Sequence, residues 1–73
     1  MRPNPTTGEV EVVGTTDKVT EVLVLDMNGR KMAEYQQMSR FDVSDLPAGF
    51  YIVRLKTLSA TDEKVSYVKL VKR

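Results

Sequence analysis

The chain has 73 residues, which allows one domain at most, and a domain of this size buries only roughly 60% of the surface of its unfolded chain. With 11 basic and 10 acidic side chains its net charge is +1, so no overall field draws it to nucleic acid or to an anionic membrane. The absence of histidine and cysteine excludes Ser-His-Asp and thiol catalysis, histidine and cysteine metal sites, and disulfide bridges. We therefore expect a domain that is not an enzyme and that has no catalytic residue, cofactor or metal.

Short apolar stretches separated by turn residues at intervals of about 8 to 12 positions predict an all-β sandwich. The first stretch, Glu9 to Val13, alternates, and we expect Val10 and Val12 to face the core. The next stretch, Thr20 to Asp26, is apolar on both faces in its middle. It predicts a central strand that is covered on two sides.

The dipeptide Asn28-Gly29 lies between that strand and the run 30–35. Asparagine and glycine tolerate the two positive φ angles of a type I′ turn, so we predict a two-residue hairpin here. A second change of direction is expected at Gln36 to Ser39. The short strand that follows, 40–43, should place Phe41 and Val43 on one face.

The segment Ser44 to Gly49 predicts a corner at which the chain passes from one sheet to the other. Pro47 fixes φ for the first central position of a type I turn, and Gly49 suits its last position. In the strand 50–55 the charged Arg54 does not belong in the core. The inward-facing residues of this strand are therefore predicted to be Tyr51, Val53 and Leu55.

The polar stretch Thr57 to Glu63 predicts a loop before a final strand, 64–73, in which Val68 and Leu70 face the core. Outward-facing apolar side chains of the last two strands would form a docking patch if the strands are neighbours. These are Phe50, Ile52, Tyr67 and Val71.

Four of these segments together resemble the C-terminal sorting domain of type IX secretion cargo. The run Pro3-Asn4-Pro5-Thr6-Thr7-Gly8 is similar to the opening motif of that family, and Asp26 to Arg30 is similar to its aspartate-x-x-glycine-arginine hairpin. Val43 to Tyr51 is similar to its serine-x-leucine-proline-x-glycine-x-tyrosine corner, and Lys69 to Lys72 to its terminal motif. The resemblance extends over essentially the whole chain. One departure is Met-Arg before the first proline, where an aromatic or apolar residue often stands.

The resemblance implies an immunoglobulin-like antiparallel β-sandwich of about seven short strands that carries the export signal in its last strand. Its implied partners are an upstream cargo domain in cis, the type IX outer-membrane translocon, shuttle proteins and a surface sortase. The cargo would pass through the periplasm of a Gram-negative bacterium and reach the outer membrane, the cell surface or the medium. The recognition residues implied are Pro3, Asn4, Pro5, Gly8, Asp26, Gly29, Arg30, Leu46, Pro47, Gly49, Tyr51, Lys69, Leu70, Val71, Lys72 and Arg73.

We expect residues 1–73 to be a single sorting domain cut from a larger secreted protein. No apolar run approaches the roughly 20 residues that span a bilayer, and residues 1–5 lack the apolar core of a signal peptide. An upstream part of the protein would then supply the signal for crossing the inner membrane. A truncated sandwich of this kind can also dimerise by strand exchange.

Two other hypotheses remain open. An immunoglobulin-like structural or adhesive spacer shares the hairpin and the glycine-x-tyrosine strand, but it should tolerate relocation to the middle of a protein. A small sugar-binding domain or enzyme is disfavoured because the sequence shows no aromatic platform or polar cluster. Individual motif residues also have simpler interpretations, since Gly29 and Gly49 suit backbone geometry and Lys69, Lys72 and Arg73 can be solubilising charges on an edge strand.

Overall fold

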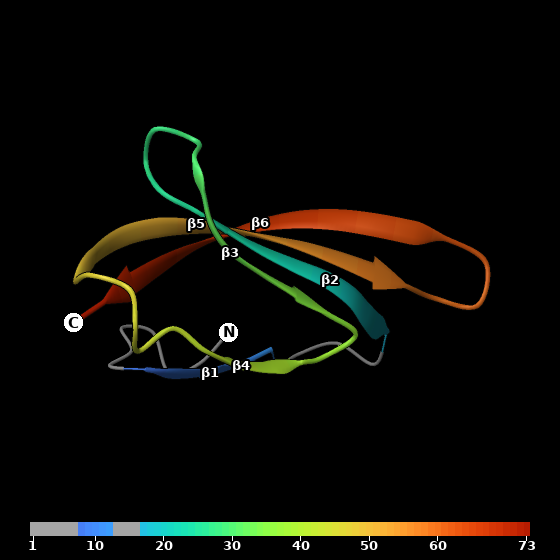
Figure 1. Cartoon of the computed structure of the whole chain (residues 1–73). Coiled ribbons are helices and arrows are strands. Elements are labelled where there is room, and N and C mark those ends of the chain that lie inside the picture. The colour runs from blue at the N-terminus through green and yellow to red at the C-terminus, as the bar shows by residue number, and fades with distance from the viewer. Residues whose placement is uncertain (1–7, 13–16) are drawn as a thin grey trace.

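The computed structural model describes residues 8–12 and 17–73, which form two antiparallel sheets (Figure 1). The described residues contain six strands and no helix, and this confirms the all-β prediction. The strands are β1 (Glu9–Glu11), β2 (Lys18–Leu25), β3 (Lys31–Gln36), β4 (Arg40–Asp42), β5 (Gly49–Leu58) and β6 (Glu63–Lys72). The smaller sheet has the order β1-β4, and the larger has the order β3-β2-β5-β6.

The core is formed by side chains of both sheets and of the segment after β4. Valines 10, 22, 24 and 53 and Leu70 are completely buried, and each such side chain stabilises the fold by about 1.5–3 kcal/mol relative to an exposed position. Alternation along the strands selects these residues, as predicted. The predictions for inward-facing residues are confirmed, since Phe41, Val43, Tyr51 and Leu55 are also buried, and Val12 and Val68 are partly buried and pack against the core.

Strand β2 is central in the larger sheet, as predicted, because it pairs with both β3 and β5. Only one of its faces is fully covered. Val22 and Val24 are buried against the core, whereas Leu23 and Leu25 on the other face are half-buried. On that outer face the neighbouring side chains of the same sheet supply the cover, since Leu23 lies opposite Arg54.

The five residues 26–30 join β2 to β3, where the sequence predicted a two-residue turn. The Gly29 N–H donates to the Asp26 carbonyl at 3.0 Å, and the Asp26 N–H donates to the Arg30 carbonyl at 2.9 Å. Gly29 has a φ of 85°, but Asn28 has no positive φ, so the type I′ prediction is wrong. The Asp26 carboxylate accepts the N–H groups of Asn28 and Arg30, and this favours a turn that begins one residue earlier than predicted.

The corner carries the chain from the smaller sheet to the larger one, as predicted, but its hydrogen-bonded turn lies earlier. The Leu46 N–H donates to the Val43 carbonyl at 3.0 Å, and the Ser44 N–H donates to the Asp42 carboxylate at 2.8 Å. The turn therefore spans 43–46 instead of 46–49, because the aspartate side chain fixes the chain directly after β4. Gly49 is the first residue of β5 and has a φ of 154°, a conformation that glycine adopts far more readily than other residues.

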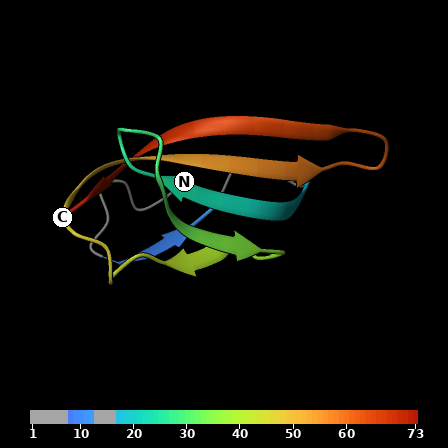
Figure 2. The same ribbon diagram turned by 45° about the horizontal axis from the view of Figure 1, so that its top comes forward.

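Strands β5 and β6 form a hairpin that is longer than predicted and extends past the other labelled strands (Figures 1 and 2). β5 continues to Leu58 and β6 begins at Glu63, so the loop is confined to 59–62 instead of 57–63. Thr57 is buried within β5. Threonine suits a half-buried strand surface, so the polar character of this segment does not stop the pairing.

Candidate recognition surface

The described segments of the four motifs gather at one end of the domain (Figures 1 and 2). Leu25 pairs with Ile52, which places the loop after β2 beside the start of β5. Gly49 pairs with Lys72, which places the end of β6 beside the corner. We call this region the motif end and define it by Gly8, Asp26–Arg30, Leu46–Tyr51 and Lys69–Arg73.

The opening motif reaches the motif end through Gly8. Pro3, Asn4 and Pro5 lie outside the described residues. The Gly8 carbonyl accepts the Val43 N–H at 2.8 Å, and a Cβ atom on Gly8 would lie 3.2 Å from the Ser44 Cβ. Glycine therefore allows the first segment to lie close against the corner.

In the loop after β2 some residues fix the shape of the loop and others are exposed on its surface. The Asp26 carboxylate accepts two backbone N–H groups at 2.9 Å each and lies 3.3 Å from the Arg30 Nε. Its pKa is lowered from the ordinary value, mainly by the backbone N–H of Arg30, with the Asn28 N–H and the guanidinium charge contributing. The Arg30 side chain is 78% exposed. Asp26 and Gly29 thus shape the loop, and Arg30 presents a positive charge to solvent.

The corner is held by one aromatic side chain. The Tyr51 ring is buried, and its hydroxyl donates to the Pro47 carbonyl at 2.5 Å. Leu46 is half-buried and packs against the core, whereas Pro47 is exposed. Leu46 and Tyr51 therefore contribute to the fold, and Pro47 lies on the surface.

The terminal motif is divided between the interior and the surface by the alternation of β6. Leu70 and Lys72 are buried, whereas Lys69 and Arg73 are exposed and Val71 is half-buried. The Lys72 Nζ donates to the Arg73 carbonyl at 3.0 Å. Two of the four motif residues, Leu70 and Lys72, are therefore unavailable to a partner that binds the folded surface.

The displayed part of the motif end includes Phe50, which the predicted recognition residues omit. Phe50 is 54% exposed, and the Lys69 Nζ lies 4.6 Å from the centroid of its ring, within the range of a cation–π contact. Val71 pairs with Phe50, and Ile52 pairs with Lys69, so this part of the predicted apolar patch is continuous. Tyr67 lies farther along β6, opposite Arg54. The alternation that places Tyr51 inside places Phe50 outside, so the sequence contained this signal.

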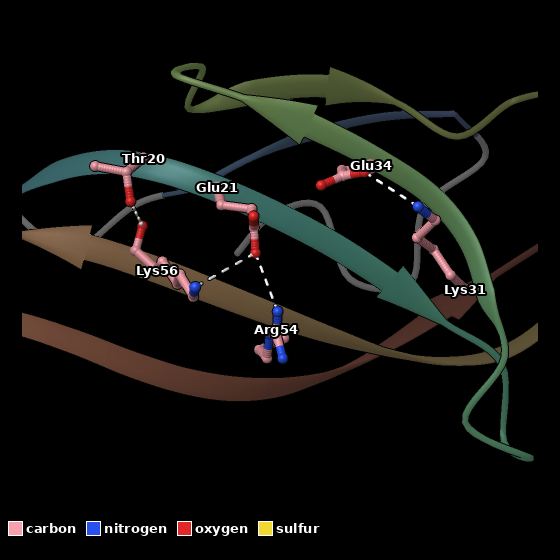
Figure 3. A network of polar contacts seen from close by, with 6 residues as sticks. All are labelled: Thr20, Glu21, Lys31, Glu34, Arg54 and Lys56. Atoms are coloured by element: carbon pink, nitrogen blue, oxygen red, sulfur yellow. Dashed lines mark hydrogen bonds and ion pairs between the residues drawn. The ribbon is translucent and has the colours of Figure 1, made fainter.

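An ion-pair network borders the patch on the outer face of the larger sheet (Figure 3). Glu21 of β2 lies 3.1 Å from Arg54 and 4.0 Å from Lys56, both on β5. The Lys31–Glu34 pair on β3 is more exposed, and exposed pairs contribute only about 0–1 kcal/mol each. The network gives the middle of this face a polar surface, which lies between the apolar patch of the motif end and the exposed Leu58 and Val65 at the other end of the hairpin.

The described residues offer no arrangement for metal binding and no membrane-spanning helix. They contain no group of three or more acidic side chains that could hold a metal ion. Within residues 8–12 and 17–73, no helix is long and apolar enough to cross a bilayer. The motif end itself combines an apolar patch with exposed basic side chains.

The comparisons agree with the motifs. Residues 1–72 match the family model described as secretion system C-terminal sorting domain. No curated protein and no solved structure matches the chain.

Proposed function

This chain belongs to the family of type IX secretion system C-terminal sorting domains, and on this basis we propose that the export machinery recognises its folded motif end. A sorting domain of this family acts for a cargo protein to which it is linked, and the cargo is exported to the cell surface or secreted. In our proposal the cargo crosses the periplasm, the outer-membrane translocon and its shuttle proteins bind the domain, and a surface sortase then removes it.

The convergence of the motifs carries this proposal. Segments separated by up to some tens of positions meet at one end of the domain, and each contributes a displayed or a shape-giving residue there. The displayed residues are Arg30, Pro47, Phe50, Lys69 and Arg73. A receptor that binds this surface would distinguish the folded domain from an unfolded chain that carries the same motifs, because only folding brings them together.

We further propose that the sandwich is immunoglobulin-like. The bond from the Tyr51 hydroxyl to a carbonyl four residues upstream has the arrangement of the tyrosine corner of such sandwiches. The passage from β4 to β5 between two sheets supports the same assignment.

The test is a fusion of residues 1–73 to an inert periplasmic reporter in a bacterium with a type IX system. We expect the reporter at the cell surface or in the medium, and retention after deletion of Lys69–Arg73. Mass spectrometry of the exported reporter should show removal of the domain if a sortase acts. Retention of the intact fusion, with the domain folded, would contradict the proposal and favour a structural or adhesive spacer.

Deletion of Lys69–Arg73 also removes Leu70 from the core, so a surface variant is needed to separate recognition from folding. We expect the double variant Phe50→Ala, Lys69→Ala to remain folded and to reduce export. The matched control is Leu58→Ala, Lys64→Ala, which removes an exposed apolar side chain and an exposed lysine from the same two strands at the other end of the hairpin. Equal export of the two double variants would contradict recognition through the Phe50 surface.

A further inference from the structure

β6 is an unusually regular strand at one edge of the larger sheet. All ten residues of β6 pair with β5 without a register shift, and the strand contains no proline or glycine. Natural edge strands are commonly short, bulged or interrupted by proline, which prevents them from pairing with a further chain. In the larger sheet of the described residues β6 is a terminal strand, so the backbone groups on its far side face away from β5.

The opposite edge of the same sheet is protected in several ways. β3 has only six residues, its pairing with β2 has a register shift, and it is followed by Gln37 with a φ of 55°. The Tyr35 hydroxyl also donates to the Asp42 carbonyl at 2.6 Å, which ties β3 to the smaller sheet. These features make β3 a poor template for a further strand, and they are missing from β6.

The accessible part of the β6 edge is its first half. Residues 63–67 are exposed on both faces of the sheet, and Val65 and Tyr67 are 47% and 66% exposed. Both side chains lie on the outer face, and Lys64 and Ser66 lie on the inner face. A strand added here would cover apolar surface on one side and meet small or long polar side chains on the other.

We propose that this edge pairs with the same edge of a second copy of the chain, antiparallel and centred on Ser66, so that the two larger sheets join into one. In this register Ser66 lies opposite Ser66 of the second copy, Val65 lies opposite its Tyr67, and Lys64 lies opposite its Val68. Valine–tyrosine and serine–serine cross-strand pairs are favourable, and no like charges lie directly opposite each other. A register centred on Lys64 would place two lysines opposite each other.

The pairing leaves each chain's own strands in place and so differs from dimerisation by strand exchange. The pairing involves only residues 64–68 of each chain, so the surface it buries is well below the roughly 1,000 Å² expected of a stable interface. The dimer is therefore weak and dissociates on dilution. The two-fold symmetry makes the interface self-complementary and closes it at two chains.

The register can be tested by cross-linking because the 73-residue chain contains no cysteine. Ser66→Cys would place two sulfur-bearing residues directly opposite each other, where the Cα separation of roughly 4.5–5.5 Å suits a disulfide. Lys64→Cys is the matched control, because its two copies would lie four residues out of register, roughly 13 Å apart. We expect mild oxidation to give a covalent dimer of Ser66→Cys and at least tenfold less of Lys64→Cys. Equal yields would overturn the proposed pairing.

Sedimentation equilibrium of the full chain should show a monomer–dimer equilibrium that shifts with concentration. Val65→Glu places a carboxylate opposite the chain's own Lys56, so β5–β6 pairing is preserved, and it should weaken dimerisation about tenfold. Leu58→Lys, which faces Glu63 on the same surface but not on the edge strand, should leave the dimer unchanged. Three results would overturn the proposal. The chain could be a monomer at every concentration, its dimer could survive dilution as a strand-exchanged dimer does, or the β6 edge could pair only with another protein.

Discussion

The hydroxyl of Tyr51 donates a hydrogen bond to the backbone carbonyl of Pro47, 2.5 Å away. This bond ties the start of β5 to the corner that precedes it. The ring is buried among core residues while Pro47 is exposed. One side chain therefore anchors a surface segment of the motif end to the interior.

Tyr51→Phe should lower the free energy of unfolding by about 0.5–1.5 kcal/mol, because the ring still packs but the Pro47 carbonyl loses its partner. Urea denaturation followed by circular dichroism measures this change. Tyr67→Phe is the control, since the exposed Tyr67 should change stability by less than about 0.5 kcal/mol. Equal losses for the two variants would contradict a stabilising role of the Tyr51 hydroxyl.

Gly29→Ala should destabilise the domain by about 1–2 kcal/mol, because an alanine at a φ of 85° is strained even though its Cβ would meet no atom within 4 Å. Asparagine tolerates this conformation, so Gly29→Asn should lose clearly less. The midpoints of urea unfolding give both values. If both substitutions lower the free energy of unfolding equally, the positive φ of Gly29 is not the cause of the loss.

Leu70→Ala should cost about 2–5 kcal/mol because it removes a completely buried side chain. A small domain has little stability to lose, so we expect a large unfolded fraction at 37 °C. The neighbouring Lys69→Ala should change stability by no more than about 1 kcal/mol, since it removes an exposed side chain that contacts the Phe50 ring. Thermal unfolding of the two single variants measures this difference, and similar melting temperatures would contradict the division of the motif into buried and displayed residues.

The pH dependence of stability should reflect Asp26 and Asp42. The pKa of each carboxyl is lowered in the folded state, for Asp26 mainly by the Arg30 N–H and for Asp42 mainly by the Ser44 N–H. A lowered pKa favours the folded state above the unfolded pKa of about 3.9, and this contribution disappears as the pH falls through the folded pKa. Stability should therefore fall below about pH 4, and less steeply for Asp26→Asn. Denaturant midpoints at pH 3 and pH 6 measure the loss of stability for the unsubstituted chain and for Asp26→Asn. An equal decrease of the midpoint in the two proteins would contradict the prediction.

Most of the inward-facing residues could be predicted from the sequence because the two-residue period of a strand fixes which side chains share a face. Val22, Tyr51 and Leu70 follow this period, and all are buried. The turns were harder to predict. Asn28-Gly29 suits a type I′ turn, but Asp26 accepts two N–H groups and moves the turn by one residue, and such competition between side chains is not visible in a dipeptide.

Strand order could not be predicted, because hydrophobic alternation says nothing about which strands are neighbours. The meeting of the motifs at one end therefore required the structure, since it depends on the pairing of Leu25 with Ile52 and of Gly49 with Lys72. The length of the last hairpin was underestimated for a related reason. Thr57 has a polar side chain, but it is buried once β5 pairs with β2 and β6.

The alternation within Lys69–Arg73 has a consequence for how such domains diverge. Positions 70 and 72 are constrained by the chain's own interior, so accepted changes there should be coupled to changes in core residues such as Val53. Positions 69 and 73 are exposed and position 71 is half-buried, so changes there should follow changes in the binding partners that we propose. We therefore expect these five consecutive residues to vary in two alternating patterns, one set by the fold and one set by the proposed receptor, and a comparison of many cargo tails should separate the patterns position by position.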